Sequence, residues 1–235
     1  PNRLNQQLIV SWYRGGDGCG NVGSSDDGGA YWINLTENNT IQWFVRGDYD
    51  NNDNLSTEVS REFLEDGNWH HIAGTYNRDE SVAKLYIDGV EVDSDNSTVL
   101  DVITGCTIDP IPLTFGRSHK TYDGAVMDEY FDGSIDNIQL WYRALSQQEI
   151  LQSIYTENYG TNDDALIGHW SFNDAPGSEL IDLSGNENNG DINGATWTND
   201  VSIPGCNDPS ANNFNPESNT AVNCLYNEGP DWYVA

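Results

Sequence analysis

Short runs of β-forming residues, separated by clusters of Gly, Asn and Asp, recur along most of this 235-residue chain. Val, Ile, Thr and the aromatic residues are enriched in strands, whereas Gly, Asn and Asp favour turns. Many short strands with turn signals between them indicate an antiparallel sandwich or barrel. The runs cover 8–13, 30–35, 41–46, 69–76, 83–87, 113–116, 134–142 and 166–172.

Two local signals add a hairpin and a helix to this pattern. Asp88-Gly89 separates two of the β-forming runs, and Asp-Gly is typical of a two-residue hairpin turn. Ser146 and Glu149 have the spacing of a capping box, which marks the start of a helix. The apolar residues that follow repeat at helical spacing, so we predict one short helix over 146–155 that packs on the sandwich.

The balance of charge restricts the partners of this chain. Its 9 Lys and Arg face 38 Asp and Glu, a formal net charge of −29 at pH 7. Such a surface repels phosphate groups, which argues against nucleic acid and against anionic membrane surfaces. Membrane insertion is not expected either, because no stretch approaches the roughly 18 apolar residues of a span.

The four cysteines indicate disulfides. Their even number and the lack of a CxxC spacing favour an oxidising compartment over a zinc site, with four free thiols as the alternative. Four cysteines allow three pairings. We predict that Cys206 pairs with Cys224 as a local loop and that Cys19 pairs with Cys106 inside the main domain.

The domain organisation changes character near the end of the chain. A polar joint at 156–164 is followed by a strand-like run, then by a Gly- and Asn-rich segment at 182–198. We predict one domain over 1–200, closed by strands within 165–200, and a small disulfide-bounded tail at 205–226. The alternative is that 165–197 begins a second, truncated sandwich.

Several ordered motifs resemble a known family. They are Trp69-His-His-Ile-Ala-Gly-Thr-Tyr, Leu85-Tyr-Ile-Asp-Gly, Leu113-Thr-Phe-Gly-Arg and Phe131-Asp-Gly-Ser-Ile-Asp-Asn-Ile-Gln-Leu-Trp. Together they resemble the laminin-G-like, concanavalin-A-like jelly-roll family, which includes pentraxin-like modules, over about 7–155. Residues 166–173 and 182–197 resemble the segment that accompanies such domains in secreted bacterial proteins. Residues 205–216 resemble a cysteine-bounded repeat of large Bacteroidetes-type surface proteins, except that Asn212 and Phe214 replace its usual Cys and Tyr.

The resemblance implies an all-β fold, a two-sheet antiparallel jelly-roll sandwich of the concanavalin A-like type with one short helix. One face of such a sandwich is often concave, and loops at its rim hold calcium and ligands. The resemblance names no ligand, because a fold alone never identifies one.

Carboxylate-rich loops are candidate calcium sites. The segment 47–54 contains Asp48, Asp50 and Asp53, and calcium takes six to eight hard oxygen ligands. A second cluster consists of Asp182, Asn186, Asn188 and Asp191, and Asp132 and Asp136, which flank Gly133-Ser134 before a strand, could approach it in space. In the family that the motifs resemble, such loops often hold a structural calcium ion. The alternatives are a solvated acidic turn for the first loop and a plain Asn-Gly turn for the second.

Aromatic residues near the acidic loops suggest a carbohydrate ligand, because sugar rings stack on Trp and Tyr while Asp and Asn bond hydroxyl groups. In a strand only one of two adjacent residues points outward, so many of these aromatic residues belong to the core. The expected ligand contacts are Tyr49, Tyr122, Trp43, Asp26 and Asp27.

Catalysis has little support in the sequence. Asp128, Asp132 and Asp136 share a parity, but Gly133 interrupts the strand and Glu129 faces the other way, and no nucleophile or phosphate-loop motif is present. We therefore predict a calcium-stabilised, non-catalytic module that binds a glycan or surface ligand. It would be extracellular or at the cell surface, within a larger multidomain chain. The alternatives are a structural spacer without a ligand and, ranked last, a glycan-cleaving enzyme.

Overall fold

A computed structural model describes residues 7–14, 28–46, 54–96, 112–117, 121–122, 125–126, 130–156, 159–173, 177–220, 224–227 and 232–234. The chain forms two compact units. Unit 1 consists of Pro1–Glu65, Gly74–Leu85 and Glu91–Gly133, and unit 2 of Asp66–Ala73, Tyr86–Val90 and Ser134–Ala235.

The described residues form strands in antiparallel sheets and one α-helix, which confirms the predicted all-β class. The early strands are β1 (Gln7–Arg14), β2 (Gly28–Leu35), β3 (Thr40–Arg46), β4 (Asn54–Ser60), β5 (Ile72–Asn77), β6 (Val82–Ile87) and β7 (Val90–Asp95), with a 3₁₀ turn at Glu62–Glu65. The later elements are β8 (Thr114–Phe115), β9 (Thr121–Tyr122), β10 (Ala125–Val126), β11 (Ile138–Trp141), α1 (Gln147–Tyr155), β12 (Leu166–Trp170), β13 (Glu179–Leu180), β14 (Gly190–Asp191), β15 (Leu225–Asn227) and β16 (Trp232–Val234).

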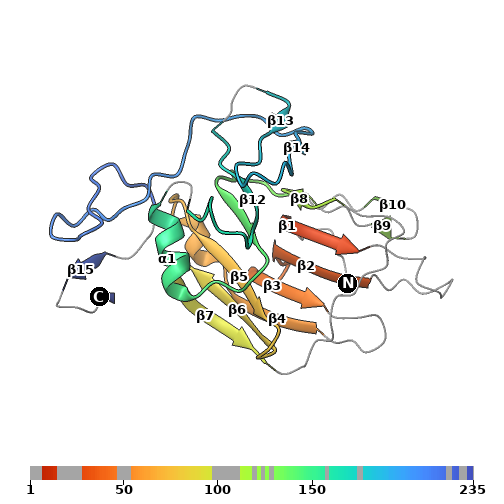
Figure 1. Cartoon of the computed structure of the whole chain (residues 1–235), viewed down its shortest axis with the longest axis horizontal. Coiled ribbons are helices and arrows are strands. Elements are labelled where there is room, and N and C mark those ends of the chain that lie inside the picture. The colour runs from red at the N-terminus through yellow and green to blue at the C-terminus, as the bar shows by residue number, and fades with distance from the viewer. Residues whose placement is uncertain are drawn as a thin grey trace. The chain divides into compact units, whose positions relative to one another are not determined.

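Unit 1 is built on a five-stranded sheet with the order β4-β3-β2-β1-β8 (Figure 1). Directly opposite residues of an antiparallel pair share a face, and the faces alternate along each strand. Ile41, Trp43 and Val45 of β3 are at most 8% exposed, so they define the inner face. Their partners on β2, among them Ile33 and Leu35, lie on the same face.

A second sheet, with the order β5-β6-β7, lies against this inner face within unit 1. The indole Nε1 of Trp43 donates a hydrogen bond to the carbonyl of Thr75 on β5 (3.1 Å). A Cβ on Gly74 would lie 2.3 Å from the Trp43 ring, so glycine is what allows the two sheets to approach here. Ala83 and Leu85 of β6 are fully buried and complete this part of the core.

The predicted hairpin and helix both form, within unit 2. Asp88 (φ 51°) and Gly89 (φ 79°) join β6 to β7 with two left-handed residues, as a type I′ turn requires. Ser146 caps α1, because its hydroxyl accepts from the Glu149 N–H (3.3 Å) and the Glu149 carboxylate accepts from the Ser146 N–H (2.8 Å). A Cβ on Gly89 would lie 2.3 Å from Leu151 of α1, so the helix packs directly on the turn.

The end of the chain is tied into unit 2. The run predicted at 166–172 forms β12, which pairs with β11. The predicted Cys206–Cys224 disulfide is present, with a Cα–Cα distance of 5.1 Å. In the tail that it closes, the Asn213 amide donates to the Tyr155 hydroxyl of α1 (2.8 Å). The carbonyl of Asn219 in the same tail accepts the Trp69 N–H (2.9 Å). Cys19 and Cys106 lie outside the described residues.

Candidate functional site

The outer face of the five-stranded sheet carries a stacked aromatic pair. Trp32 of β2 lies directly opposite Phe44 of β3, on the face away from Trp43. The two rings stack with their centroids 4.0 Å apart and their planes 13° from parallel. Both side chains are half-buried. Because the two neighbouring strands fix their positions, these rings form a rigid surface.

Polar side chains surround this pair on the same face. Ser11 of β1 pairs with Trp32, and its hydroxyl bonds to the Thr114 hydroxyl on β8 (2.8 Å). On the other side, Gln42 of β3 pairs with Glu58 of β4, whose carboxylate accepts the Thr40 hydroxyl. Ser11 is fully buried, so a ligand on this face meets Gln42 and Glu58 beside the two aromatic rings. An amide and a carboxylate next to aromatic rings suit a ligand with one apolar face and several hydroxyl groups.

The strand register places Trp43, the aromatic residue expected from the sequence to contact a ligand, on the opposite face from the Trp32–Phe44 pair. Trp43, expected as a ligand contact, is 8% exposed and lies on the inner face, where its position suits core packing. Its neighbour Phe44 points to the other face. Which of Trp43 and Phe44 faces outward is determined by the register of the β2–β3 pairing across the turn at 36–39. The alternation along β3 alone does not determine it.

Most of the predicted ligand contacts and the first calcium loop fall elsewhere in the chain. Tyr122 belongs to β9, where its backbone pairs with Ala125 of β10. The remaining predicted residues of this group lie outside the described residues, namely Asp26, Asp27, Asp48, Tyr49, Asp50 and Asp53.

Asp182, a predicted calcium ligand, sits at the centre of a hydrogen-bonded loop. Its carboxylate, in a residue only 7% exposed, accepts from the N–H groups of His169 (2.9 Å), Ser184 (2.9 Å) and Asn188 (3.0 Å), and from the Ser184 hydroxyl (2.8 Å). Burial acts to raise the pKa of Asp182, but these hydrogen bonds outweigh it and lower that pKa.

Its predicted partners in the same loop also bond to protein groups. The Asn186 amide donates to the carbonyls of Leu166 (2.8 Å) and Ile167 (3.1 Å), and the Asn188 amide donates to Ile167 (2.8 Å). These bonds fasten the loop to β12. Asp191, at the end of β14, is exposed.

The other two predicted ligands belong to different units. Asp136, in unit 2, accepts from the N–H (3.1 Å) and hydroxyl (2.8 Å) of Ser202. Asp132, in unit 1, is exposed, and its N–H donates to the Gln7 amide (3.0 Å). Within the part of the chain that the structure describes, no three His, Cys, Asp or Glu side chains are grouped as a metal site would need. Calcium binding stays a prediction.

Two adjacent histidines in unit 2 have opposite electrostatic surroundings. The His70 ring, 5% exposed, contacts Asp88 (Nδ1–Oδ2 2.9 Å) and Asp66 (Nε2–Oδ1 3.2 Å). Burial acts to lower the pKa of His70, but the bonds to Asp88 and Asp66 outweigh it and raise that pKa. Burial lowers the pKa of His71 to about 4, despite the nearby charge of Asp88.

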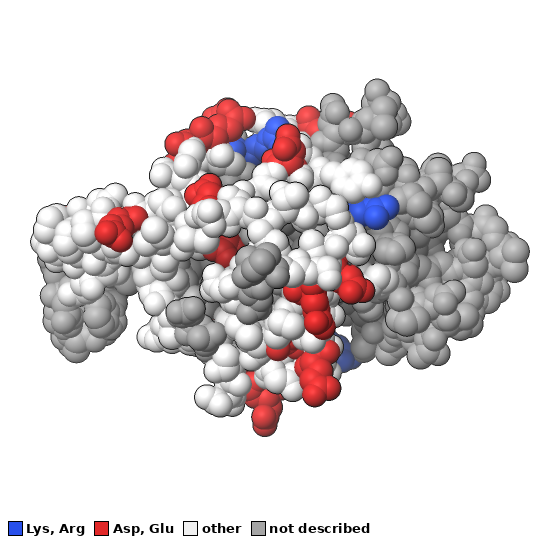
Figure 2. Space-filling model, turned by 90° about the horizontal axis from the view of Figure 1, so that it is seen from above, with Lys and Arg blue, Asp and Glu red and all other residues white. Residues whose placement is uncertain are grey.

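The charged side chains of the surface are mostly acidic. Figure 2 shows several separate groups of acidic side chains on the face seen from above, and fewer Lys or Arg side chains. Where basic groups are described, they are often neutralised, as when Lys84 pairs with Glu91 (2.8 Å). Such a surface favours an uncharged ligand over an anionic one.

A comparison with known families accounts for this sandwich. The profile of the Concanavalin A-like lectin/glucanases superfamily, named Laminin_G_3, matches residues 5–151. The chain belongs to this superfamily. The match confirms the laminin-G-like resemblance of the sequence motifs and the concanavalin A-like class of the sandwich. Lectins and glucanases share this fold, so membership leaves both binding and hydrolysis to be argued from the site.

Solved structures give distant likenesses to this lectin-like domain. A candidate carbohydrate-binding protein from Bacteroides ovatus is 13% identical with a TM-score of 0.49, over 78% of this chain and 50% of that one. The chain thus spans half the length of that protein. An S-layer domain-containing protein from Clostridium thermocellum is 22% identical with a TM-score of 0.31, over 65% of this chain and 64% of that one.

The CBM40 domain of the Ruminococcus gnavus IT-sialidase, bound to α2,3-sialyllactose, is 15% identical with a TM-score of 0.42, over 63% of this chain and 82% of that one. These likenesses are too distant to assign a ligand. No curated protein matched the lectin-like chain. Among its described residues, no helix has the length and apolar character needed to cross a membrane.

Proposed function

We propose that this chain is a non-catalytic carbohydrate-binding module of an extracellular or cell-surface protein. The observation that carries the proposal is the Trp32–Phe44 pair on the outer face of the sheet. The apolar face of a pyranose ring stacks on aromatic rings, while its hydroxyl groups bond to side chains such as Gln42 and Glu58 beside the pair. The Cys206–Cys224 disulfide supports the oxidising location.

The carboxylates of the same face argue for binding rather than hydrolysis. A retaining glycosidase needs two carboxyl groups about 5–5.5 Å apart, and an inverting enzyme also needs two. Among the described strand residues on the outer face, Glu58 is the only carboxylate, and it already accepts a hydrogen bond from Thr40. Within the described strands of this sheet, a glycan on this face therefore meets one carboxylate rather than two. The nearby Asp93 carboxylate of β7 accepts the Glu58 N–H (2.9 Å).

Replacing Trp32, the larger ring of the aromatic pair, tests the proposal. We expect Trp32→Ala to weaken binding to a neutral polysaccharide such as laminarin or xylan about tenfold, because one stacking surface is lost. Affinity electrophoresis on a panel of such polysaccharides measures the change, and circular dichroism confirms that the variant folds. Tyr130→Ala is the control, since Tyr130 is 53% exposed and belongs to unit 1 but to none of the strands of this sheet.

A spacer domain without a ligand is the competing hypothesis, and the same experiment separates the two. A spacer shows no retention by any polysaccharide in the panel. Retention that Trp32→Ala leaves unchanged places the glycan elsewhere and contradicts the role given to the outer face. Hydrolysis of any panel member overturns the non-catalytic part of the proposal.

We also propose a structural calcium ion, in the loop of Asp48, Asp50 and Asp53. The support is the sequence pattern of three carboxylates within six residues together with the large negative charge of the chain. Calcium bound there raises the melting temperature, because a ligand that binds only the folded state stabilises it. Equal melting temperatures in calcium chloride and in EDTA contradict the proposal. Asp50→Asn is expected to remove this rise, and Asp79→Asn, at an exposed position outside both predicted calcium clusters, is the control variant.

A further inference from the structure

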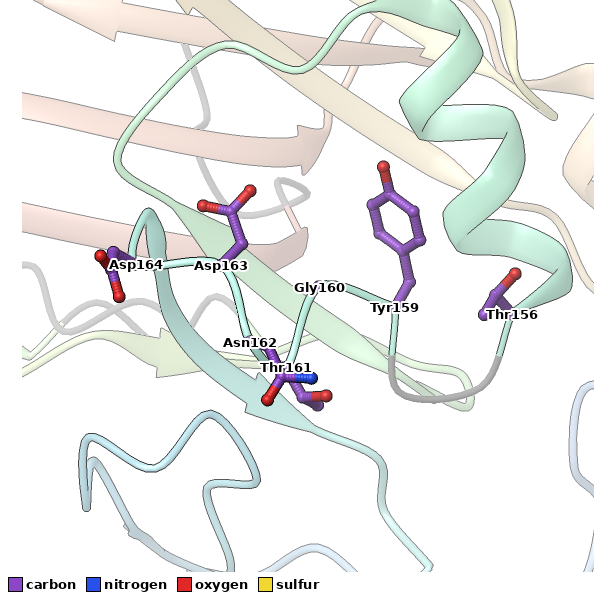
Figure 3. A pocket seen from close by; sticks show the side chains of 7 residues that line it. All are labelled: Thr156, Tyr159, Gly160, Thr161, Asn162, Asp163 and Asp164. Carbon is purple, nitrogen blue, oxygen red and sulfur yellow. The ribbon is translucent and has the colours of Figure 1, made fainter.

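A hollow on unit 2 lies in the connection between α1 and β12. Thr156 and the five residues from Gly160 to Asp164, with Tyr159, line it, and its volume is about 580 Å³. Figure 3 shows that the side chains of Tyr159 and Asp163 project in the same direction from this connection. The volume falls within the range of about 300–1,000 Å³ that is usual for small-ligand sites.

The walls of this hollow are held in place by polar and aromatic contacts. Arg143 forms ion pairs with both Asp163 (2.9 Å) and Glu149 (2.8 Å), and these partners raise the pKa of its guanidinium. Gly160 (φ 76°) passes so close to the Trp141 ring that a Cβ there would lie 2.0 Å from it. The Trp141 and Tyr159 rings lie 6.0 Å apart. The connection is therefore shaped before any ligand arrives.

Polar groups in the lining remain available to a ligand. Within the described part of the chain, no hydrogen bond is made by the side chains of Tyr159, Thr161, Asn162 and Asp164, nor by that of Thr156. Asp163, by contrast, is occupied, because it accepts from the Ala165 N–H (2.9 Å) as well as from Arg143. Hydroxyl, amide and carboxylate groups at one hollow suit a ligand rich in hydroxyl groups.

The backbone of an exposed aromatic residue bonds to the chain next to this hollow. Tyr142, at the end of β11, is 86% exposed. Its N–H donates to the carbonyl of Ala165 (2.8 Å), which places its backbone beside Asp164 at one end of the lining. A large ring left in water on a hydrogen-bonded segment offers a stacking surface that a sugar ring can cover.

The local charge selects among sugars. Arg143 is the cation of the cluster, and three carboxylates accompany it, those of Glu149, Asp163 and Asp164. The cluster therefore has a net negative charge, which repels uronic acids, sialic acids and sulfated sugars.

We propose that this hollow is a second saccharide-binding subsite, which takes one or two neutral pyranose units through Tyr159 and Asn162, with the exposed Tyr142 ring as a further stacking surface. It lies outside the aromatic face assigned above and extends the proposed function to a second place on the chain.

Titration of the ¹⁵N-labelled chain with neutral and anionic probes tests this proposal. The neutral probes are cellohexaose, laminarihexaose and mannohexaose, and the anionic probe is hexagalacturonate. We expect at least one neutral probe to shift the amide signals of residues 159–164 separately from those of β2 and β3, and hexagalacturonate to shift neither set. Tyr159→Phe and Asn162→Ala are each expected to weaken the binding reported by residues 159–164 about threefold to tenfold, since each removes hydrogen bonds to the ligand.

Matched variants keep the two sites distinct. Tyr159→Phe keeps the packing on Trp141, and Asn199→Ala is the control for loss of an exposed amide in the same unit. If Trp32→Ala abolishes all shifts and the hollow's variants change nothing, the second subsite is overturned and the proposed function stands. If only the hollow responds, the outer face is overturned instead. Absence of any shift with all neutral probes overturns both proposals.

Discussion

The two adjacent histidines should make the stability of unit 2 depend on pH in opposite directions. The pKa of His71 falls from its ordinary 6.5 to about 4 because the ring is buried, and its Nδ1 has no hydrogen-bond partner among the described residues. The unfolded chain thus binds a proton at a pH where the folded chain does not. The stability that His71 contributes is complete above pH 6.5 and is lost as the pH falls towards 4.

The size of this effect follows from the two pKa values. At pH 5 the unfolded imidazole is almost fully protonated and the folded one is mostly neutral, so the free energy of unfolding drops by about 2 kcal/mol relative to pH 7.5. The pKa of His70 is raised, so its contribution is complete below 6.5 and is lost as the pH rises through its folded value. The free energy of unfolding should therefore be largest at a pH between the folded-state pKa values of His71 and His70.

Variants separate the two contributions. His71→Phe removes the buried titrating group, and we expect urea unfolding of this variant to lose most of the fall in stability between pH 6.5 and pH 5. His70→Asn is the control, because it leaves that fall in place and removes the loss on the alkaline side. Direct NMR titration of the His71 ring gives an independent measurement. An unchanged acid slope in His71→Phe, or a His71 ring that titrates near 6.5, refutes the reasoning.

Three further substitutions test the packing by urea unfolding at neutral pH. Gly74→Ala should lower the free energy of unfolding by about 2–3 kcal/mol, because the new methyl group overlaps the Trp43 ring, whereas Gly177→Ala, with no neighbour closer than 3.8 Å, should be nearly neutral. Asp182→Asn should cost about 2 kcal/mol, since an amide replaces a carboxylate that four donors face, and Asp191→Asn at an exposed position should cost far less. Ser146→Ala should cost about 1 kcal/mol through loss of the helix cap, with Ser94→Ala as the control. If a variant and its control lose the same free energy of unfolding, the local structure described for that variant is contradicted.

Local chemistry made much of the fold predictable. Asp88-Gly89 specifies its own turn because both positions adopt positive φ, and Ser146 with Glu149 specifies a helix start through bonds within four residues. The Cys206–Cys224 disulfide closes a short loop, so its pairing needs little knowledge of the distant chain. In each case the residues that decide the structure are close in sequence.

The site was harder to predict because it depends on register. Trp43 and Phe44 are neighbours with similar side chains, yet one contacts Gly74 across the sandwich and the other stacks on Trp32 at the outer face. A shift of one residue in the β2–β3 pairing would exchange their faces. The surroundings of the hollow near α1 were missed for a related reason, since the backbone bond between Tyr142 and Ala165 joins two parts of the chain that are distant in sequence.

The Asp182 loop shows why an oxygen-rich sequence does not by itself specify a cation. Three backbone N–H groups and a hydroxyl point at its carboxylate, so the positive ends of four dipoles converge where a calcium ion would bind. A cation at Asp182 would have to displace these donors, and the amides of Asn186 and Asn188 would have to release the carbonyls of β12. The protein's own donors stabilise the negative charge of this carboxylate and lower the pKa of Asp182. We therefore expect Asp182→Asn to leave the response to EDTA unchanged, and a chelator effect that disappears in this variant contradicts the argument.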